Sequence, residues 1–351
     1  MIYNRAGFPI SRLRRVAMAK IRTVLGDKDP AELGHILPHE HTFFHLLGAP
    51  SDPAAAFDRE KAVEEGAAQL RAVGEEFGIS GLVDWTPHDL GRDMGLMVEL
   101  SRASGWDIVA STGIFGAWGY PAYWEAQSTA AIEDFFTREI EEGAVDEGVK
   151  CGAIKVGTLL QPHERPSGSV SSPDRLLSGR DRRVLEVAAR VQAKLGVPVV
   201  THTDSLDWPL GNVGLAHIDT LVGAGADPEK CVIGHVSQTT NVDHVIEVLE
   251  RGCYVAFDTI GIETVVSDWT NSTMVAELVG LGYEKRILLS HDLFVKEVGR
   301  PPESGPTAGE GHAPDYGHVQ RTFVPWLREA GVSEQAIREM TAENPKRAFA
   351  Y

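Results

Sequence analysis

The sequence contains little cysteine and no long apolar run. Its three cysteines, Cys151, Cys231 and Cys253, are odd in number, far apart and in no C-x-x-C pair. This argues against a disulfide scaffold or a cysteine zinc knuckle and fits a reducing compartment. No stretch of about 18 apolar residues is present to span a bilayer, and the basic first twenty residues lack the apolar core of a secretory signal. We therefore expect a cytoplasmic protein.

Positive charge is also scarce. The chain has 33 lysines and arginines against 50 aspartates and glutamates, a net charge of −17. An acidic surface repels phosphate backbones and anionic lipid. We expect no nucleic-acid or membrane partner, and a small molecule as the substrate.

Several catalytic motifs are missing. Neither G-x-G-x-x-G nor a Walker loop follows an early strand, which disfavours a doubly wound nucleotide-binding sheet. A G-x-S-x-G elbow is absent, and no cysteine has a paired histidine motif. The chain thus offers no side-chain nucleophile of a familiar type.

Short β-rich runs alternate with amphipathic helical stretches along most of the chain. The predicted strands are Ile36–His41, Gly81–Thr86, Ile108–Gly113, Ala153–Thr158, Pro198–Thr203, Val232–Val236, Tyr254–Thr259 and Ile287–Asp292. The predicted helices are Arg59–Phe77, Met94–Ser104, Ile132–Glu147, Arg182–Leu195, Val242–Arg251, Thr273–Leu281 and Val319–Ala330. Eight strands separated by helices predict an α/β fold, a (β/α)8 TIM barrel.

We expect one barrel domain over residues 21–351. Residues 1–20 are predicted to be an N-terminal extension, either disordered or a mis-assigned start, because Met18 opens a more typical beginning. Two Pro- and Gly-rich segments, Leu159–Gly179 and Leu293–Asp315, follow strands, so they are candidates for a substrate lid.

The motif His39-Glu40-His41 ends the first predicted strand. Side chains two apart on a strand share a face, so both imidazoles reach into one site while Glu40 faces away. Two imidazoles on one strand end are typical of zinc-type sites. The alternative is two unrelated histidines.

Later strands also end in ionisable groups. Lys155 lies in strand four, His202 ends strand five, His235 ends strand six and Asp292 ends strand eight. Singly, each has a structural alternative: an interior histidine with satisfied hydrogen bonds, or an aspartate that caps a turn. Active sites of this fold gather at the C-terminal ends of the strands. The joint occurrence therefore favours a metal site.

The ordered set of H-x-H, Lys, His, His and Asp over eight strands resembles the amidohydrolase superfamily, and within it the phosphotriesterase-like family. The similar motifs are ILPHEHTF, LVDWTPHDLGRD, VASTG, GAIKVGT, GVPVVTHT, CVIGH, ILLSHD and ENPKRAF, over roughly residues 21–350.

The resemblance implies a binuclear metal centre at the C-terminal ends of the strands. His39, His41 and Asp292 would hold the more buried cation, and His202 and His235 the more exposed one. Lys155, carboxylated by carbon dioxide, would bridge both, because desolvation favours the neutral amine that adds carbon dioxide. Zinc is expected first, with manganese or cobalt as alternatives.

The resemblance also implies hydrolysis by a water or hydroxide shared between the cations, with Asp292 as the catalytic proton carrier. In phosphotriesterases proper a histidine ends strand seven and continues a proton relay. Here Thr259 stands at that position, and Ser237 and Gln238 follow strand six. This counts against phosphotriesters as the evolved substrate. The arginine that related lactonases often carry at the strand-seven position is missing too.

Aromatic and cationic residues follow strands three and eight. The predicted substrate-binding residues are Phe115, Trp118, Tyr120, Phe294, Arg300, His312 and Tyr316. Aromatic walls with a few cationic groups suit a small ester, lactone or amide that has an apolar part and also, as a further option, a carboxylate, sulfonate or phosphate. The resemblance also implies a homodimer, which the family often forms. The alternatives are therefore a homodimer contact for the aromatics and a solvated loop for the cations. His291 alternates to the other face of its strand and is expected to be a structural residue or one that contacts the metal ligands from outside the site.

We rank three hypotheses for function. The first is a metal-dependent hydrolase of carboxylic esters, most of all lactones. The second is the same site acting on an amide or an organophosphate triester. The third, from another class, is a barrel that binds a ligand without chemistry, which metal analysis distinguishes from the others.

Overall fold

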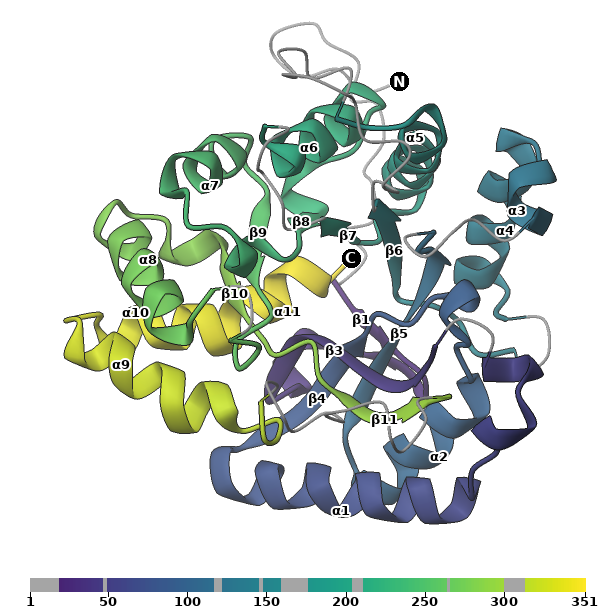
Figure 1. Ribbon diagram of the computed structural model, residues 1–351, viewed down its shortest axis with the longest axis horizontal. Helices are drawn as coiled ribbons and strands as arrows, with labels where there is room; N and C mark the ends of the chain where they lie inside the picture. Colours follow the sequence, from purple (N-terminus) through teal and green to yellow (C-terminus); the bar gives the residue numbers. More distant parts are fainter. Residues whose placement is uncertain are drawn as a thin grey trace, which may run out of the picture.

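The computed structural model describes residues 19–46, 49–116, 122–144, 148–158, 176–203, 211–263, 266–299 and 313–351. Its main sheet has nine strands in the order β10-β9-β8-β7-β6-β5-β4-β3-β11, and every neighbouring pair is parallel. The strands curl around a centre, with helices outside (Figure 1). The main-sheet strands are β3 (His35–His45), β4 (Ile79–Asp84), β5 (Asp107–Ile114), β6 (Ala153–Thr158), β7 (Val199–Thr203), β8 (Cys231–Ile233), β9 (Tyr254–Phe257), β10 (Ile287–Leu289) and β11 (Phe294–Val298). The predicted TIM barrel is confirmed.

Helices cover the outside of the sheet. They are α1 (Arg59–Phe77), α2 (Met94–Ser104), α3 (Ala122–Ala126), α4 (Thr129–Glu141), α5 (Gly179–Leu195), α6 (Val213–Gly223), α7 (Val242–Leu249), α8 (Asp268–Gly280), α9 (Val324–Glu329), α10 (Glu334–Arg338) and α11 (Asn344–Phe349). The bounds of α1 match the prediction because local signals fix them: Asp58 accepts the N–H of Lys61 at 3.1 Å, and Gly78 ends the helix at φ 70°. The prediction omitted α6, which is buried on most sides and so shows little polar periodicity. Within the described residues, no helix has the length and apolar character to cross a membrane.

The core consists of two apolar layers. One layer lies inside the barrel, with one or two side chains from each strand from β3 to β10, among them Val83, Val200 and Leu288. The larger layer lies between the strands and the helices. A strand that is buried on both faces presents continuous apolar residues, which is how these strands read in the sequence. Charged side chains inside such a barrel therefore need a specific explanation.

The barrel closes through a broken eighth strand. β10 ends at Leu289, the chain kinks at Asp292, and β11 then pairs with the far part of β3. The segment between β10 and β11 also binds β3: Asp292 N donates to His39 O at 3.2 Å, and His41 N donates to Leu293 O at 2.8 Å. This contact of residues 290–293 with β3 is the seam of the barrel. The Pro- and Gly-rich segment Leu293–Asp315, predicted to be a long loop and a candidate lid, begins differently, because Phe294–Val298 forms β11.

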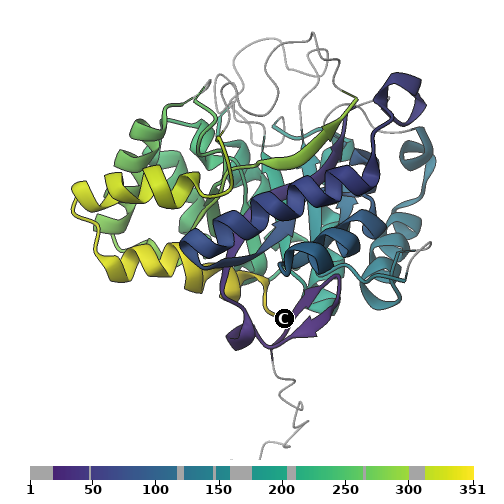
Figure 2. The same cartoon turned by 90° about the horizontal axis from the view of Figure 1, so that it is seen from below.

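The end of the barrel opposite the C-terminal ends of the strands is closed by a small hairpin, β1 (Ile21–Thr23) and β2 (Gly26–Lys28), and by the C-terminus (Figure 2). Ile21 and Phe349 reach the inner apolar layer from that end. The predicted extension, residues 1–20, lies almost entirely outside the described residues, so its separation from the barrel stays a prediction.

Candidate metal centre

The first three predicted ligands meet at the barrel seam. His39 and His41 project from the same face of β3, and Asp292 follows β10. Asp292 Oδ1 lies 3.1 Å from His41 Nε2 and 3.6 Å from His39 Nε2. One ligand atom from each residue lies within 4.8 Å of the other two. The spacing suits a single small cation with nitrogen and oxygen ligands.

The other predicted ligands adjoin this group. Lys155 Nζ lies 3.0 Å from His39 Nε2, and His202 Nδ1 lies 2.6 Å from His235 Nε2. The rings of His39 and His235 have centroids 5.2 Å apart. The structure therefore brings all six residues together from β3, β6, β7 and the segments after β8 and β10. Apart from His39 and His41, no two of these six residues lie close together in the sequence.

The protonation of this group favours a cation. Burial, and then the charge of Lys155, lower the pKa of His39 to about 4; burial and His235 lower the pKa of His202 well below its usual range. Burial alone would raise the pKa of Asp292, but the hydrogen bond from His41 and the nearby histidines hold it well below its usual range. Unprotonated imidazoles and an ionised carboxylate are the forms that bind metal. The residues present therefore fit divalent cations.

Lys155 is fully buried beneath the other groups, with Nζ 5.9 Å from the centroid of the Trp85 ring. Burial lowers its pKa to about 8, against the opposing charges of Asp292 and Asp258. Close strand packing brings it here: a Cβ on Gly113, where φ is 136°, would lie 1.7 Å from Lys155 O. Carboxylation requires the neutral amine, and a buried lysine with a lowered pKa supplies more of that form.

Asp258, which sequence reasoning passed over, supports two ligands at once. Its Oδ2 lies 2.5 Å from His39 Nδ1, and its Oδ1 accepts from His235 Nδ1 at 3.0 Å and from His235 N at 2.8 Å. Burial opposes ionisation of Asp258, but both histidines outweigh it and hold its pKa below its usual range. Each imidazole then presents Nε2 to the site, the arrangement that orients metal-ligating histidines. The signal for Asp258 in the sequence was an aspartate directly after β9 and directly before Thr259, the position expected for the relay histidine.

Two of the predicted ligands have strained backbones. His235 (φ 59°) and Asp292 (φ 58°) are the only non-glycine residues in the left-handed region among those that the structure describes. This conformation costs about 1–3 kcal/mol for each residue and persists where the surroundings over-determine it. Strain confined to two predicted ligands supports a functional role for both positions.

A cavity with a volume of about 170 Å³ opens above the ligands. Its polar lining residues are four predicted ligands, His41, Lys155, His202 and Asp292. The remaining lining residues are apolar: Phe44, Leu90, Phe115, Ile262 and Phe294. A small uncharged molecule fits such walls better than an anion does.

The predicted substrate-binding residues divide into three groups. Phe115 and Phe294 line the cavity, and the Phe115 ring lies edge-on to His202 with centroids 4.7 Å apart. Tyr316 is not brought to the cavity: it is buried, and its hydroxyl donates to His41 O at 2.9 Å. The others, Trp118, Tyr120, Arg300 and His312, lie outside the described residues.

Asp89 is a further residue that sequence reasoning missed. It accepts the backbone N–H of Phe115 at 2.9 Å and of Gly116 at 2.8 Å. These two bonds fix the chain after β5 and, with it, the Phe115 wall of the cavity. The only signal in the sequence for this residue was its place in the motif LVDWTPHDLGRD.

At the position expected for the relay histidine, Thr259 forms a hydroxyl pair. Its Oγ1 lies 2.6 Å from Ser237 Oγ, and both residues are buried. Hydroxyl groups of this kind do not titrate near neutral pH, so the pair supplies no acid or base.

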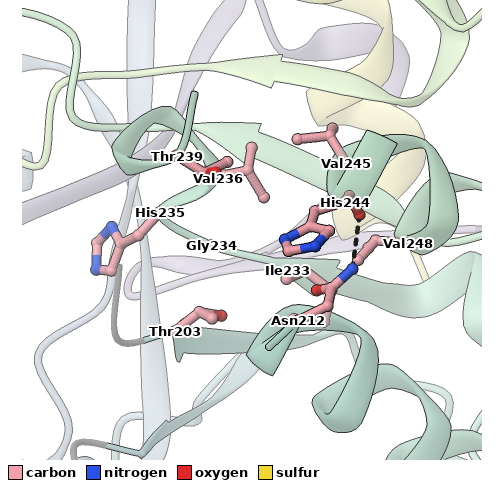
Figure 3. Close-up of a pocket in the computed structure, with 11 residues that line it drawn as sticks. Thr203, Asn212, Ile233, Gly234, His235, Val236, Thr239, His244, Val245 and Val248 are labelled. Atoms are coloured by element: carbon pink, nitrogen blue, oxygen red, sulfur yellow. Dashed lines mark hydrogen bonds between the residues drawn. The ribbon is translucent and has the colours of Figure 1, made fainter. Parts of the chain in front are cut away.

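A second pocket lies behind β8, between α6 and α7 (Figure 3). His235 turns its ring away from it, and Asn212 Nδ2 donates to His244 O at 2.9 Å beside it. Its volume of about 20 Å³ is room for about one water molecule. This pocket is therefore too small for a substrate.

Comparison with known proteins gives a consistent result. The model of the phosphotriesterase family matches residues 19–349. A phosphotriesterase homology protein of Mycobacterium tuberculosis is 28% identical over 341 residues, covering 95% of this chain and 98% of that protein. An N-acetyltaurine hydrolase of Rattus norvegicus is 29% identical over 366 residues, covering 93% and 97%. The crystal structure of a PTE-like lactonase mutant of Deinococcus radiodurans superposes with a TM-score of 0.82 at 30% identity, covering 94% of this chain and 99% of that one.

Proposed function

The chain belongs to the phosphotriesterase family of metal-dependent hydrolases, and on that premise we propose that it hydrolyses a small uncharged carboxylic ester, a lactone first of all. The observation that carries the substrate class is the cavity, in which the described polar side chains are all predicted ligands and the walls are apolar. An aliphatic ring or chain would lie against Phe115 and Phe294. Apart from Lys155, the proposed carbamate bridge, the described lining residues offer no cationic side chain to the sulfonate of N-acetyltaurine.

Two divalent cations are proposed, one held by His39, His41 and Asp292 and one by His202 and His235, with carboxylated Lys155 between them. Zinc is proposed first, with manganese and cobalt as alternatives. Such cations lower the pKa of a bound water and polarise a carbonyl oxygen. Histidine, carboxylate and carbamate groups are all suitable ligands.

In the proposed reaction the oxygen of water adds to the lactone carbonyl carbon, and the bond from that carbon to the ring oxygen breaks. Asp292 accepts the proton of the water and returns it to the departing ring oxygen. Phe115 and Phe294 exclude bulk water from the apolar part of the substrate. The product is a hydroxy acid, with every atom of water retained.

The metal part of the proposal is tested on the purified protein by elemental analysis. We expect two equivalents of transition metal per chain, loss of activity on chelation, and recovery with zinc, manganese or cobalt. A protein that holds no metal and hydrolyses none of the substrates below would support the third hypothesis, a non-catalytic barrel.

The substrate part is tested with one metal-loaded preparation against lactones, aryl esters, N-acyl amides and phosphotriesters. We expect the highest kcat/KM for lactones. A preparation of Lys155→Ala purified in the same way controls for contaminating esterases. A higher kcat/KM for an amide or a phosphotriester would replace the lactone proposal with the second hypothesis.

The cytoplasmic location and the homodimer stay predictions from the sequence. Light scattering measures the mass of the purified protein in solution and shows whether it is a homodimer.

A further inference from the structure

Asp292 lies between two backbone amides that donate to one buried carboxylate. Glu40, on β3 between His39 and His41, accepts from His291 N at 3.2 Å through Oε1 and from Leu293 N at 2.8 Å through Oε2. Asp292 N itself donates to His39 O at 3.2 Å. Three successive amides of the seam are therefore fixed to two consecutive residues of β3.

Side chains complete the set around Glu40. Its Oε1 also accepts from Ser290 Oγ at 2.8 Å and lies 2.7 Å from His291 Nδ1. His291 Nε2 accepts from Val319 N at 3.0 Å, so the ring hydrogen is on Nδ1 and points at Glu40. The two carboxylate oxygens thus meet four donors, and Glu40 is fully buried.

This arrangement has a direct consequence for the left-handed backbone of Asp292. The kink at Asp292 turns the chain from β10 into β11 and brings the amides on both sides of it toward β3. An anionic group that accepts the backbone N–H groups on both sides of such a turn stabilises it. The same turn directs the Asp292 carboxylate to His41 and His39.

We propose that Glu40 is a positioning residue, which holds Asp292 in its left-handed conformation and so places the Asp292 carboxylate in the metal centre. This inference rests on the proposed function for its catalytic consequence only. The contacts between Glu40 and the seam are made by protein atoms alone, so they can be measured on the metal-free protein as well as on the metal-loaded one.

The test is Glu40→Gln, which keeps the size of the side chain and replaces one acceptor oxygen with an NH2 group. Because four donors face this side chain, an amide leaves at least one donor opposed to another. Glu139→Gln is the matched control: Glu139 is equally buried, on α4, and is paired with Arg92. Any general cost of replacing a buried carboxylate appears in both variants.

We expect faster hydrogen exchange of the peptide over residues 290–293 in metal-free Glu40→Gln, with no change there in Glu139→Gln. In the metal-loaded enzyme we expect kcat to fall about 10- to 100-fold with KM within about threefold. Elemental analysis should show weaker binding of one of the two cations. Glu40→Asp, which keeps the charge on a shorter side chain, should give an intermediate loss, and it replaces Glu40→Gln in these measurements if that variant does not fold.

Unchanged exchange at residues 290–293 in the Glu40 variant would overturn the inference, and so would kcat and metal content equal to the wild type. The inference would also be overturned if Glu40→Gln lost both cations and its Tm fell, and Glu139→Gln showed the same losses. The effect would then be a general cost of replacing a buried carboxylate. If the wild type binds no metal, the proposed function fails, while the exchange result still decides whether Glu40 holds the seam.

Discussion

The two predicted metal corners are built differently. The seam corner, defined here as His39, His41 and Asp292, joins the first and last strands of the barrel. Asp258 and Thr86 contact its two histidines from behind, and Glu40 accepts the backbone N–H groups on both sides of Asp292. Among the described residues, the outer corner, defined as His202 and His235, has one such support, Asp258 on His235, while His202 is half-buried against Phe115 at the cavity wall.

This difference separates residues that affect folding from residues that affect contact with the substrate. The seam corner closes the barrel, so a change there alters folding as well as metal binding. The outer corner adjoins the apolar wall, so a change there alters contact with the substrate. Asp258 and Lys155 contact or adjoin both corners, and their replacement should remove the distinction.

The largest effect is expected for Lys155→Ala, because it removes the proposed bridge between the corners. Activity should fall on the order of a thousandfold or more, and short-chain carboxylates that mimic the carbamate should restore part of it. Lys296→Ala is the control, since Lys296 lies on β11 with Nζ 5.7 Å from the centroid of the Phe57 ring and does not line the cavity. Full activity of Lys155→Ala would refute the bridging role.

Asp292→Asn breaks the seam corner alone. We expect a loss of about 100- to 1000-fold in kcat, because both a ligand and the proposed proton carrier are changed. The metal content should fall toward one equivalent, with the outer cation retained. A variant that turns over at the wild-type rate would remove Asp292 as the proton carrier.

Asp258→Asn tests whether the corners are coupled. Because one carboxylate orients His39 and His235, we expect affinity for both cations to fall about 10- to 100-fold. The control is Asp268→Asn, since buried Asp268 pairs with His318 at 2.9 Å and contacts none of the predicted ligands among the described residues. Weaker binding of only one cation in the Asp258 variant would show that the corners are independent.

The smallest effect concerns a buried histidine that has no carboxylate neighbour among the described residues. His217 contacts Thr158 Oγ1 through Nε2 and Thr203 Oγ1 through Nδ1 at 3.2 Å, and burial lowers its pKa to about 3. Below pH 6.5 the unfolded chain binds a proton at His217 that the folded chain does not. The free energy of unfolding therefore decreases as the pH falls from about 6.5 toward 3. The slope approaches about 1.4 kcal/mol per pH unit.

This slope is measured as the difference in unfolding free energy between the metal-free wild type and His217→Asn at several pH values. The wild type should lose stability relative to the variant below pH 6.5 and keep a constant difference above it. A difference that does not change with pH would show that His217 is protonated equally in both states.

Part of the fold and site could be predicted from the sequence because the signals are local. Strand β6 and helices α1 and α2 have the bounds that their apolar patterns predict. His39, His41, Lys155, His202, His235 and Asp292 were chosen because each stands at or near a strand end, and the barrel brings strand ends together. The β11 strand, α6 and the N-terminal hairpin were missed, because they are short, buried on most sides or dependent on a partner strand.

The sequence by itself determined the type of barrel and the six predicted ligands, since periodicity and residue type are properties of adjacent positions. Only the tertiary structure decided what holds those ligands. Glu40 binds Ser290 from 250 positions away, Asp258 joins His39 to His235, and the backbone turns left-handed at two of the predicted ligands. A carboxylate becomes an acceptor for distant amides only when the closing barrel buries them together, and no local pattern records which amides those are.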